Sequence, residues 1–486
     1  MKVQLLKIIG LSAATLPFLG QSAIAEQKPN ILWIIADDLG TDLGCYGNKS
    51  VKTPFIDKLA SEGIQFTQLH SVTAVSSPSR SSLITGMYPV SINCHQHRTF
   101  KKKRLPEGIL PITEYFREAG YYVSNGNAIN NKQPGKTDYN FDYGDKKIFD
   151  GANWSGRKAG QPFFAQMQIH FPHRPFEKDS INQVNRKTIE LPPVYPDHPL
   201  TREDWALYLE SVQHADEYLG KLMERLEKEG LLKNTIVLFF GDQGRPMVRA
   251  KQFVYDEGTH TPFIIRFSDQ KMAGKLVNDL VSNVDIPATS LALAGIALPP
   301  KMQGQNVFSG KKREFIFCTR DRMDETVDRI RSVRSSKFKY IRNYYPQLPY
   351  SQFNTYKKTM YPVLTLMQVL YKNGKLTPDQ SNFIKPSRPA EELYSLESDP
   401  FEMKNLASNP NFSKELTRLS LALDQWLAEN DKGVYPEDAV EVAYWAKDAT
   451  QAYQLKMKNY KLPTNISDED FLKWWEYRLN VNNNEK

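Results

Sequence analysis

Apolar and polar positions along the chain alternate between short, almost wholly apolar runs and longer amphipathic stretches. Apolar runs that predict buried strands occupy residues 29–36, 162–169 and 234–240. Such runs are typical of strands in a parallel sheet that is covered on both faces. Shorter strands are predicted at residues 64–69, 120–123 and 263–267. Amphipathic segments that predict helices lie between them, at residues 53–60, 110–119, 204–228 and 285–293. Strands that alternate with helices predict an α/β fold.

The pattern changes beyond about residue 330. Residues 338–342 predict a half-buried strand, and a helix is expected near residues 416–430. The 486 residues also exceed the size that a single hydrophobic core usually serves. We therefore expect two domains.

The first residues are typical of a cleavable secretory signal. Lys2 and Lys7 precede an apolar stretch at residues 8–19, and Ala23-Ile24-Ala25 resembles a cleavage site. The apolar stretch is too short to span a bilayer, and no later segment is long and apolar enough, so we expect no membrane insertion. We expect residues 1–25 to be removed and the protein to be secreted or periplasmic in a bacterium. The three cysteines do not form a disulfide framework, even for an exported protein.

The net charge of the chain excludes few classes of binding partner. The formal net charge is +8 at pH 7, and two of these charges belong to the predicted signal. This mild excess fits an anionic substrate, although solubility alone explains it equally well. Nucleic-acid binding requires a concentrated basic face, and residues 101–104 are the only dense basic run. We therefore expect no nucleic-acid partner.

Acidic side chains follow two of the predicted buried strands. Asp37 and Asp38 come directly after residues 29–36, and Asp242 with Gln243 follows residues 234–240. Adjacent carboxylates repel each other unless a cation lies between them, and ligands of open α/β sheets gather at this end of the strands. A polar turn that caps the strand is the alternative. We favour a metal site.

A run of hydroxylated residues begins at Ser76. Pro78 suits the first turn of a helix, which places Ser76 and Ser77 at the N-terminus, where free N–H groups and the dipole favour an anion. Arg80, one turn further on, adds a fixed positive fork for a tetrahedral oxyanion. The alternative is an ordinary serine-rich cap on a surface helix.

This segment resembles the signature of type I sulfatases, which is Cys or Ser, then x-Pro-x-Arg, then Thr-Gly a few residues on. Here it is Ser76-x-Pro78-x-Arg80 with Thr85-Gly86. The order of the other polar landmarks is also similar to the family's: Asp37-Asp38, His173, Asp242-Gln243 and Lys251. The resemblance covers nearly the whole mature chain. It implies an alkaline-phosphatase-like fold, with a large, mostly parallel sheet sandwiched by helices at residues 26–325. A smaller C-terminal α+β subdomain on an antiparallel sheet is implied at residues 326–486.

The resemblance also implies the chemistry. A maturase would oxidise Ser76 to formylglycine (3-oxoalanine), whose hydrated aldehyde is the nucleophile. One Ca²⁺ would be held by Asp37, Asp38, Asp242, Gln243 and residue 76 itself. The remaining catalytic candidates are Arg80, Lys136 and Lys251 as sulfate-binding cations and His173 as proton donor.

The chain departs from the family pattern at two places. Lys136-x-Asp138 stands where many relatives carry Lys-x-His, and Lys132 is a rival for the lysine. Gln243 stands where relatives carry Asn or His, although it still supplies an oxygen. Whether Ser76 is the natural residue or replaces a cysteine stays open at this point.

The segments at residues 324–333 and 391–406 look most like N-sulfoglucosamine sulfohydrolase relatives. This implies a sulfated saccharide as substrate, with exo-action on a glycosaminoglycan or a related glycan, and an O-sulfatase of host or algal glycans stays open. Candidates for the substrate mouth are His95, His97, Arg98, Arg322 and Asp324. The alternative for the first three is a loop satisfied by its own hydrogen bonds, and for the last two a solvated turn.

Two other classes remain. A phosphoryl-transfer hydrolase of the alkaline-phosphatase superfamily would use Ser76 itself as nucleophile, but such sites usually recruit histidines for two zinc ions. The second is a glycan-binding pseudoenzyme without turnover.

Overall fold

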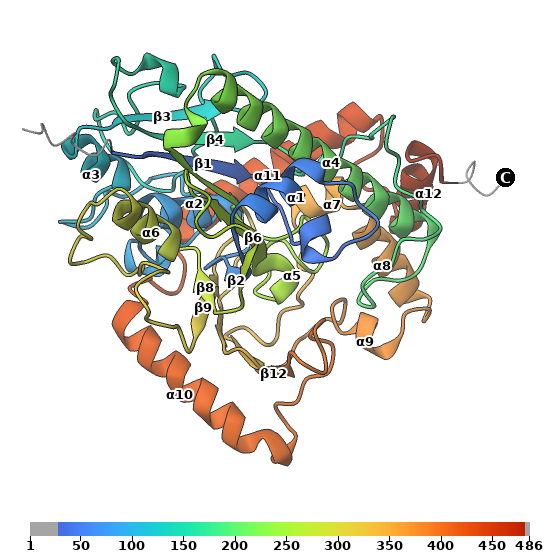
Figure 1. Ribbon diagram of the computed structural model, residues 1–486. Helices are drawn as coiled ribbons and strands as arrows, with labels where there is room; N and C mark the ends of the chain where they lie inside the picture. The colour runs from blue at the N-terminus through green and yellow to red at the C-terminus, as the bar shows by residue number, and fades with distance from the viewer. Residues whose placement is uncertain (1–27, 482–486) are drawn as a thin grey trace, which may run out of the picture.

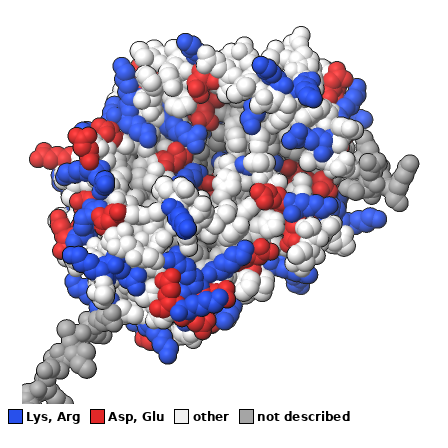
Figure 2. All heavy atoms as spheres, turned by 90° about the horizontal axis from the view of Figure 1, so that it is seen from above, with Lys and Arg blue, Asp and Glu red and all other residues white. Residues whose placement is uncertain are grey.

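The computed structural model describes residues 28–481, so the predicted signal at residues 1–25 lies outside the described residues. Within that range the chain forms an eight-stranded sheet and a four-stranded sheet (Figure 1). No helix in residues 28–481 has the length and apolarity that crossing a membrane requires. On the face shown in Figure 2, basic and acidic side chains are interspersed.

The large sheet has the strand order β3-β4-β1-β5-β6-β2-β7, and β8 pairs with β2. Its strands are β1 (Asn30–Ala36), β2 (Ile64–His70), β3 (Tyr122–Asn127), β4 (Phe163–Ile169), β5 (Thr235–Gly241), β6 (His260–Arg266), β7 (Lys275–Val277) and β8 (Val281–Ser282). The pairs among β3, β4, β1 and β5 are parallel, whereas β6 runs antiparallel to β5 and β2. The predicted mostly parallel sheet is confirmed.

Helices cover both faces of this sheet, and β1 shows why its sequence is apolar throughout. Alternate side chains of a strand point to opposite faces. Ile34 and Ala36 belong to the apolar cluster on one face, and Trp33 and Ile35 to the cluster on the other. The first face is covered by α1 (Pro54–Glu62) and α4 (Pro199–Lys228). The second is covered by α2 (Ser76–Thr85), α3 (Ile112–Glu118) and α6 (Asp285–Leu293).

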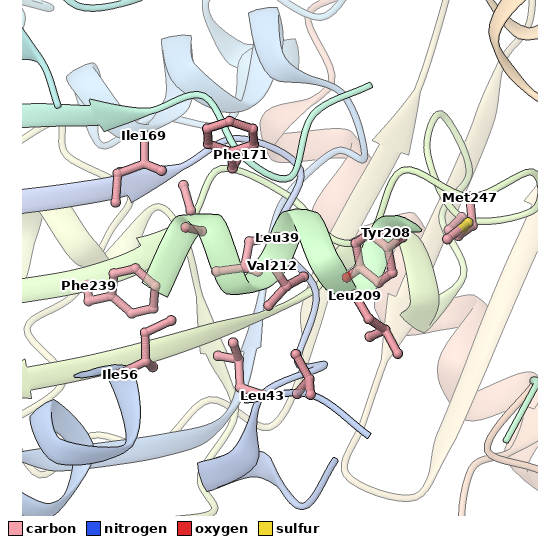
Figure 3. Packing of buried hydrophobic residues seen from close by; sticks show 14 of the residues in the cluster. Leu39, Leu43, Ile56, Ile169, Phe171, Tyr208, Leu209, Val212, Phe239 and Met247 are labelled. Carbon is pink, nitrogen blue, oxygen red and sulfur yellow. The ribbon is translucent and has the colours of Figure 1, made fainter. Parts of the chain in front are cut away.

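Helix α4 fixes the segment that follows β1. Figure 3 shows Tyr208 and Val212 of α4 among Leu39, Leu43 and other buried residues of the same cluster. The Tyr208 hydroxyl donates a 2.8 Å hydrogen bond to the carboxylate of Asp42. The loop is therefore held by packing and by a polar contact, which restricts the acidic pair at its start. The helix begins at Pro199, earlier than predicted, because proline suits a first helical turn.

The small sheet is antiparallel and has the order β12-β11-β10-β9. Its strands are β9 (Ile316–Arg320), β10 (Ile330–Arg334), β11 (Phe338–Asn343) and β12 (Glu391–Ser395). Helix α10 (Ser413–Asn430) packs Leu423 and Trp426 against Val333 and Tyr340 of this sheet and lies at the lower edge of Figure 1. Both the antiparallel sheet and the helix were expected. Strand β9, however, precedes residue 326, where we expected the second subdomain to begin.

The remaining helices are α5 (Asp256–Thr259), α7 (Thr355–Met360), α8 (Pro362–Lys372), α9 (Pro378–Ser381), α11 (Ala439–Tyr460) and α12 (Asp468–Arg478). Single 3-10 turns occur at Gly44–Tyr46, Pro89–Ser91, Trp154–Gly156, Leu232–Asn234 and Pro410–Phe412. Helix α12 packs on α8 through Leu366, Phe471 and Trp475, and α11 lies against α7. The sequence pattern predicted neither α11 nor α12.

Candidate active site

Three neighbouring strands end together at one edge of the large sheet. In register, Ala36 of β1 lies beside Ile169 of β4 and Gly241 of β5. The backbone N–H of Asp37 donates to the Ile169 carbonyl at 3.0 Å, and that of Asp242 donates to the Ala36 carbonyl at 3.1 Å. The two acidic segments predicted at separate strand ends are thereby brought side by side.

Asp37, Asp38 and Asp242 form a buried acidic cluster. One carboxylate oxygen from each lies within 4.8 Å of the others. Asp38 has a φ of 64°, a left-handed conformation that Asp tolerates better than most residues, and its N–H donates to Asp242 Oδ1 at 3.0 Å. Three buried carboxylates so close together require nearby positive charge.

A ring of cations supplies part of that charge. Each acid has its own basic partner, and in each case the basic side chain is itself mostly or wholly buried. The pairs and their N–O distances are Arg80 with Asp242 at 2.8 Å, Lys136 with Asp37 at 2.8 Å and Lys251 with Asp38 at 2.5 Å. Arg80 also donates to Gln168 Oε1 of β4 at 2.7 Å, which fixes the plane of its guanidinium.

These charges shift the pKa values in different directions. Burial alone raises the pKa of Asp37, but the attraction of Lys136 and Arg80 outweighs it and holds that pKa well below its usual range. For Asp242, burial dominates and, despite Arg80, raises the pKa to about 6. Burial, together with Lys251, lowers the pKa of His173 to about 4. At neutral pH Asp37 is therefore charged and His173 neutral, and a further cation would favour the charged form of Asp242.

Ser76 occupies the first turn of α2, directly beside this cluster. Its Oγ donates to Asp37 Oδ1 at 3.3 Å and accepts from Lys136 Nζ at 3.2 Å and from Gln243 Nε2 at 3.2 Å. All ten residues of α2 are buried. The alternative of a serine-rich surface helix is thus wrong, because α2 is a core helix whose N-terminus points at the acids. Of the two rival lysines, Lys136 reaches Ser76, and Lys132 is exposed.

The donor set fits a hard divalent cation. Gln243 Nε2 donates to Asp38 and to Ser76, whereas its Oε1 is buried without a hydrogen-bond partner among residues 28–481. Rotating the amide would turn Oε1 toward Asp38, which is favourable only when a cation lies between the two oxygens. Three carboxylates and one amide oxygen are ligands that Ca²⁺ prefers. These residues therefore fit the calcium ion expected from the sequence.

His173 lies at the rim of the site. Its Nδ1 is 2.6 Å from the carbonyl oxygen of Arg174, so Nδ1 carries the hydrogen and Nε2 is the atom that faces the acids, 3.8 Å from Asp38 Oδ2. The ring of Tyr356 from α7 lies 6.1 Å from the His173 ring and 5.3 Å from Lys251 Nζ. Tyr356 was not among the predicted site residues, and no motif marks it.

His170 and Gln168 were also not among the predicted site residues. His170 Nδ1 lies 3.9 Å from Asp37 Oδ2, and the side chain is half exposed at the end of β4. Gln168 holds Arg80 from within β4. Their signal was present, because both lie at the carboxyl end of a predicted buried strand beside His173.

The five residues predicted for the substrate mouth lie near one another but at different depths. The His97 N–H donates to the Arg322 carbonyl at 2.9 Å, and Arg322 donates to the carbonyls of Arg98 and Asp324, both at 2.9 Å. Arg322 is fully buried against Glu437, and His95 is also buried. The geometry therefore favours a scaffolding role for Arg322 and His95. Arg98 is half exposed and pairs with Asp138, while Asp324 is partly exposed and lies 3.7 Å from His97 Nε2.

Comparison with known proteins identifies relatives over most of the chain. The family model described as Sulfatase matches residues 29–296, and the model described as N-sulphoglucosamine sulphohydrolase, C-terminal matches residues 247–362. An ulvan-active sulfatase of Formosa agariphila is 33% identical over 483 residues, covering 87% of this chain and 79% of that protein. Human N-sulphoglucosamine sulphohydrolase is 25% identical over 480 residues, covering 85% and 93% of the two chains.

A solved structure extends the likeness to the fold. It holds D-glucosamine-2-N,6-O-disulfate, described as that protein's substrate. Its TM-score to this chain is 0.60 at 18% identity, covering 84% of this chain and 100% of that one.

Proposed function

The chain belongs to the sulfatase family, and from that premise we propose that it removes sulfate from a sulfated saccharide by hydrolysis, with the nucleophile at position 76. One observation carries the proposal: Ser76 Oγ lies within 3.3 Å of Asp37, Lys136 and Gln243, at the N-terminus of a buried helix. A nucleophile there has a carboxylate, a cation and an amide around it. The positive groups neutralise an incoming anion.

We propose that Ser76 is the precursor of formylglycine. Oxidation to the aldehyde supplies a hydrated carbon with one hydroxyl that attacks sulfur and a second that expels the sulfate, an exit that serine lacks. The oxidation removes two hydrogen atoms from the side chain and requires a maturase that supplies the oxidant. The same maturation would complete the oxygen ligand set of Asp37, Asp38, Asp242 and Gln243 for one Ca²⁺. When bound, this ion supplies positive charge to a sulfate oxygen.

Basic side chains of the protein supply the rest of the positive charge around the sulfate. Lys136 and Lys251 present buried or half-buried ammonium groups, and Arg80 a rigid guanidinium, around the acids and Ser76. Such preorganised charge stabilises charge that develops on the sulfuryl oxygens. His173 is the proposed proton donor to the departing oxygen. Its Nδ1–H is held by the Arg174 carbonyl, so the proton to be donated would be a second one, taken up on Nε2 when an anionic substrate raises the pKa of the ring.

The substrate is proposed from the relatives. One is described as acting on ulvan, another as an N-sulphoglucosamine sulphohydrolase, and a similar structure holds a sulfated glucosamine. Together they support a sulfated saccharide. We further propose that the enzyme acts from the chain end of a glycosaminoglycan or a related glycan. With residues 1–25 as a signal, we propose secretion or export to the periplasm.

The test is a panel of sulfated mono- and disaccharides, p-nitrophenyl sulfate and p-nitrophenyl phosphate, assayed for released sulfate or phosphate with and without a chelator. The enzyme is produced with a maturase, and the peptide that contains Ser76 is weighed by mass spectrometry. Ser76→Ala is the control. Sulfate release that depends on Ser76 oxidation and is lost with the chelator is expected. Faster release of phosphate than of sulfate, or no release from oxidised enzyme, would overturn the proposal.

A further inference from the structure

A groove of about 430 Å³ lies between α7 and α11. Tyr356 and Met360 line it from α7, and Trp445, Ala449, Ala452 and Leu455 line it from α11. The α11 residues recur every three to four positions, so they share one face of that helix. The groove is thus built along a helix face rather than from a single loop.

Two residues that line the groove lie beside residues of the catalytic site. Tyr356 lines the groove and also lies 5.3 Å from Lys251 Nζ and 6.1 Å from the His173 ring, as ring-centroid distances. Arg98 lines the groove as well, and its guanidinium pairs with Asp138, two residues after Lys136. A sugar attached to a sulfate beside Ser76, on the His173 side, would therefore lie near this groove.

The chemistry of the α11 face suits a sugar ring. Leu455 is 59% exposed, and Trp445 is half-buried, so apolar surface is presented to solvent here. Asp448 and Lys456 lie on the same face. A pyranose has apolar C–H faces and a rim of hydroxyls, and a pocket that alternates aromatic or aliphatic surface with charged hydrogen-bonding groups complements both.

The α11 side of the groove lies outside the regions that the family models match. Those regions end at residue 362, whereas α11 spans Ala439–Tyr460. We propose that the Trp445–Leu455 face of α11 is a subsite for the sugar that follows the sulfated one, and that it makes the enzyme prefer oligosaccharides. This inference rests on the proposed function, because it needs the sulfated sugar beside Ser76.

The test is a substitution on the exposed α11 side of the groove that fills it with a larger side chain. Ala452→Trp places a large ring in it, and Ala443→Trp is the matched control, because Ala443 is exposed on the opposite side of the same helix. Both variants are compared with wild type on a sulfated tetrasaccharide and on p-nitrophenyl sulfate. The ratio compared is kcat/KM for the tetrasaccharide divided by kcat/KM for p-nitrophenyl sulfate. For Ala452→Trp this ratio is expected to fall about tenfold. Ala443→Trp is expected to keep the wild-type ratio.

Two results would overturn the subsite: an unchanged ratio in Ala452→Trp, or an equal fall in Ala443→Trp. A second measurement separates this inference from the proposed function. Calorimetric titration of the tetrasaccharide into Ser76→Ala, alone and combined with Ala452→Trp, measures binding without turnover. About tenfold weaker binding in the double variant supports the subsite even if wild type releases no sulfate, and equal binding refutes it. Circular dichroism melting of each variant verifies folding.

Discussion

Replacing Lys136 by glutamine is expected to lower kcat/KM for a sulfate ester by about 30- to 1000-fold. Lys136 Nζ lies 2.9 and 2.8 Å from the two oxygens of Asp37 and 3.2 Å from Ser76 Oγ, so it contacts both the acidic cluster and the reacting position. A unit charge about 4 Å from developing negative charge is worth about 4 kcal/mol at an effective dielectric constant of about 20. The side chain is 29% exposed, and solvent screening reduces the effect to about 2–4 kcal/mol, which gives the stated range.

The chain offers a matched control in Lys132. This lysine lies in the same loop and is exposed, so Lys132→Gln removes the same charge from the protein without touching the site. Both variants are measured by steady-state hydrolysis of p-nitrophenyl sulfate at one pH and one calcium concentration, after mass analysis has shown equal oxidation of Ser76. We expect Lys132→Gln to stay within about twofold of wild type, as for surface changes away from a site. If Lys136→Gln keeps more than about a third of wild-type activity, or if Lys132→Gln loses as much, the assignment of Lys136 to the sulfate clamp is refuted.

Four further changes test other parts of the structure. Asp242→Asn removes one acid of the buried cluster and is expected to abolish the rise in melting temperature that calcium gives to wild type; a calcium response equal to wild type contradicts the metal assignment. Ser76→Ala is expected to lose turnover while calorimetry still detects saccharide binding, and residual turnover would exclude residue 76 as the nucleophile. Burial raises the pKa of Asp216 to about 7, so its contribution to stability is present below about pH 4 and is lost as the pH rises toward 7. The unfolding free energy of Asp216→Asn relative to wild type should therefore increase over that window, and a difference independent of pH argues against it. Leu423→Ala empties a fully buried position of α10 and should cost about 2–5 kcal/mol in urea unfolding, whereas Leu421→Ala, 56% exposed on the same helix, should cost less than about 1 kcal/mol; similar costs would mean that α10 does not pack as described.

The central sheet was predictable because its strands are buried on both faces. A short run that is apolar at every position, such as residues 29–36, fits a strand covered on both sides, and the polar residues that end it mark the edge where the site forms. The order of acids, serine and lysine along the chain was therefore enough to predict most residues of the candidate site. The structure adds their proximity, which the sequence could only imply.

What the sequence did not reveal has physical causes. Helix α11 buries only Glu441, Ala449 and Met457 over its length, so its apolar pattern is too sparse to predict a helix. Tyr356 reaches Lys251 from a distant part of the chain, and no local spacing encodes such a contact. Arg322 was expected near the surface because charged residues are rarely buried, but pairing with Glu437 stabilises it inside.

The complete burial of α2 implies when the proposed oxidation of Ser76 would have to occur. Ser76 is 2% exposed in the folded chain, so an enzyme that modifies its hydroxyl would need access before the chain has folded around it. Gln243, which follows β5 and contacts Ser76, is 167 residues further along. At about 5–20 residues per second, a ribosome delivers it about 10–30 seconds after Ser76. If Ser76 is oxidised as proposed, the modifying enzyme would have to act within that interval or before the chain folds, and slower folding should raise the oxidised fraction.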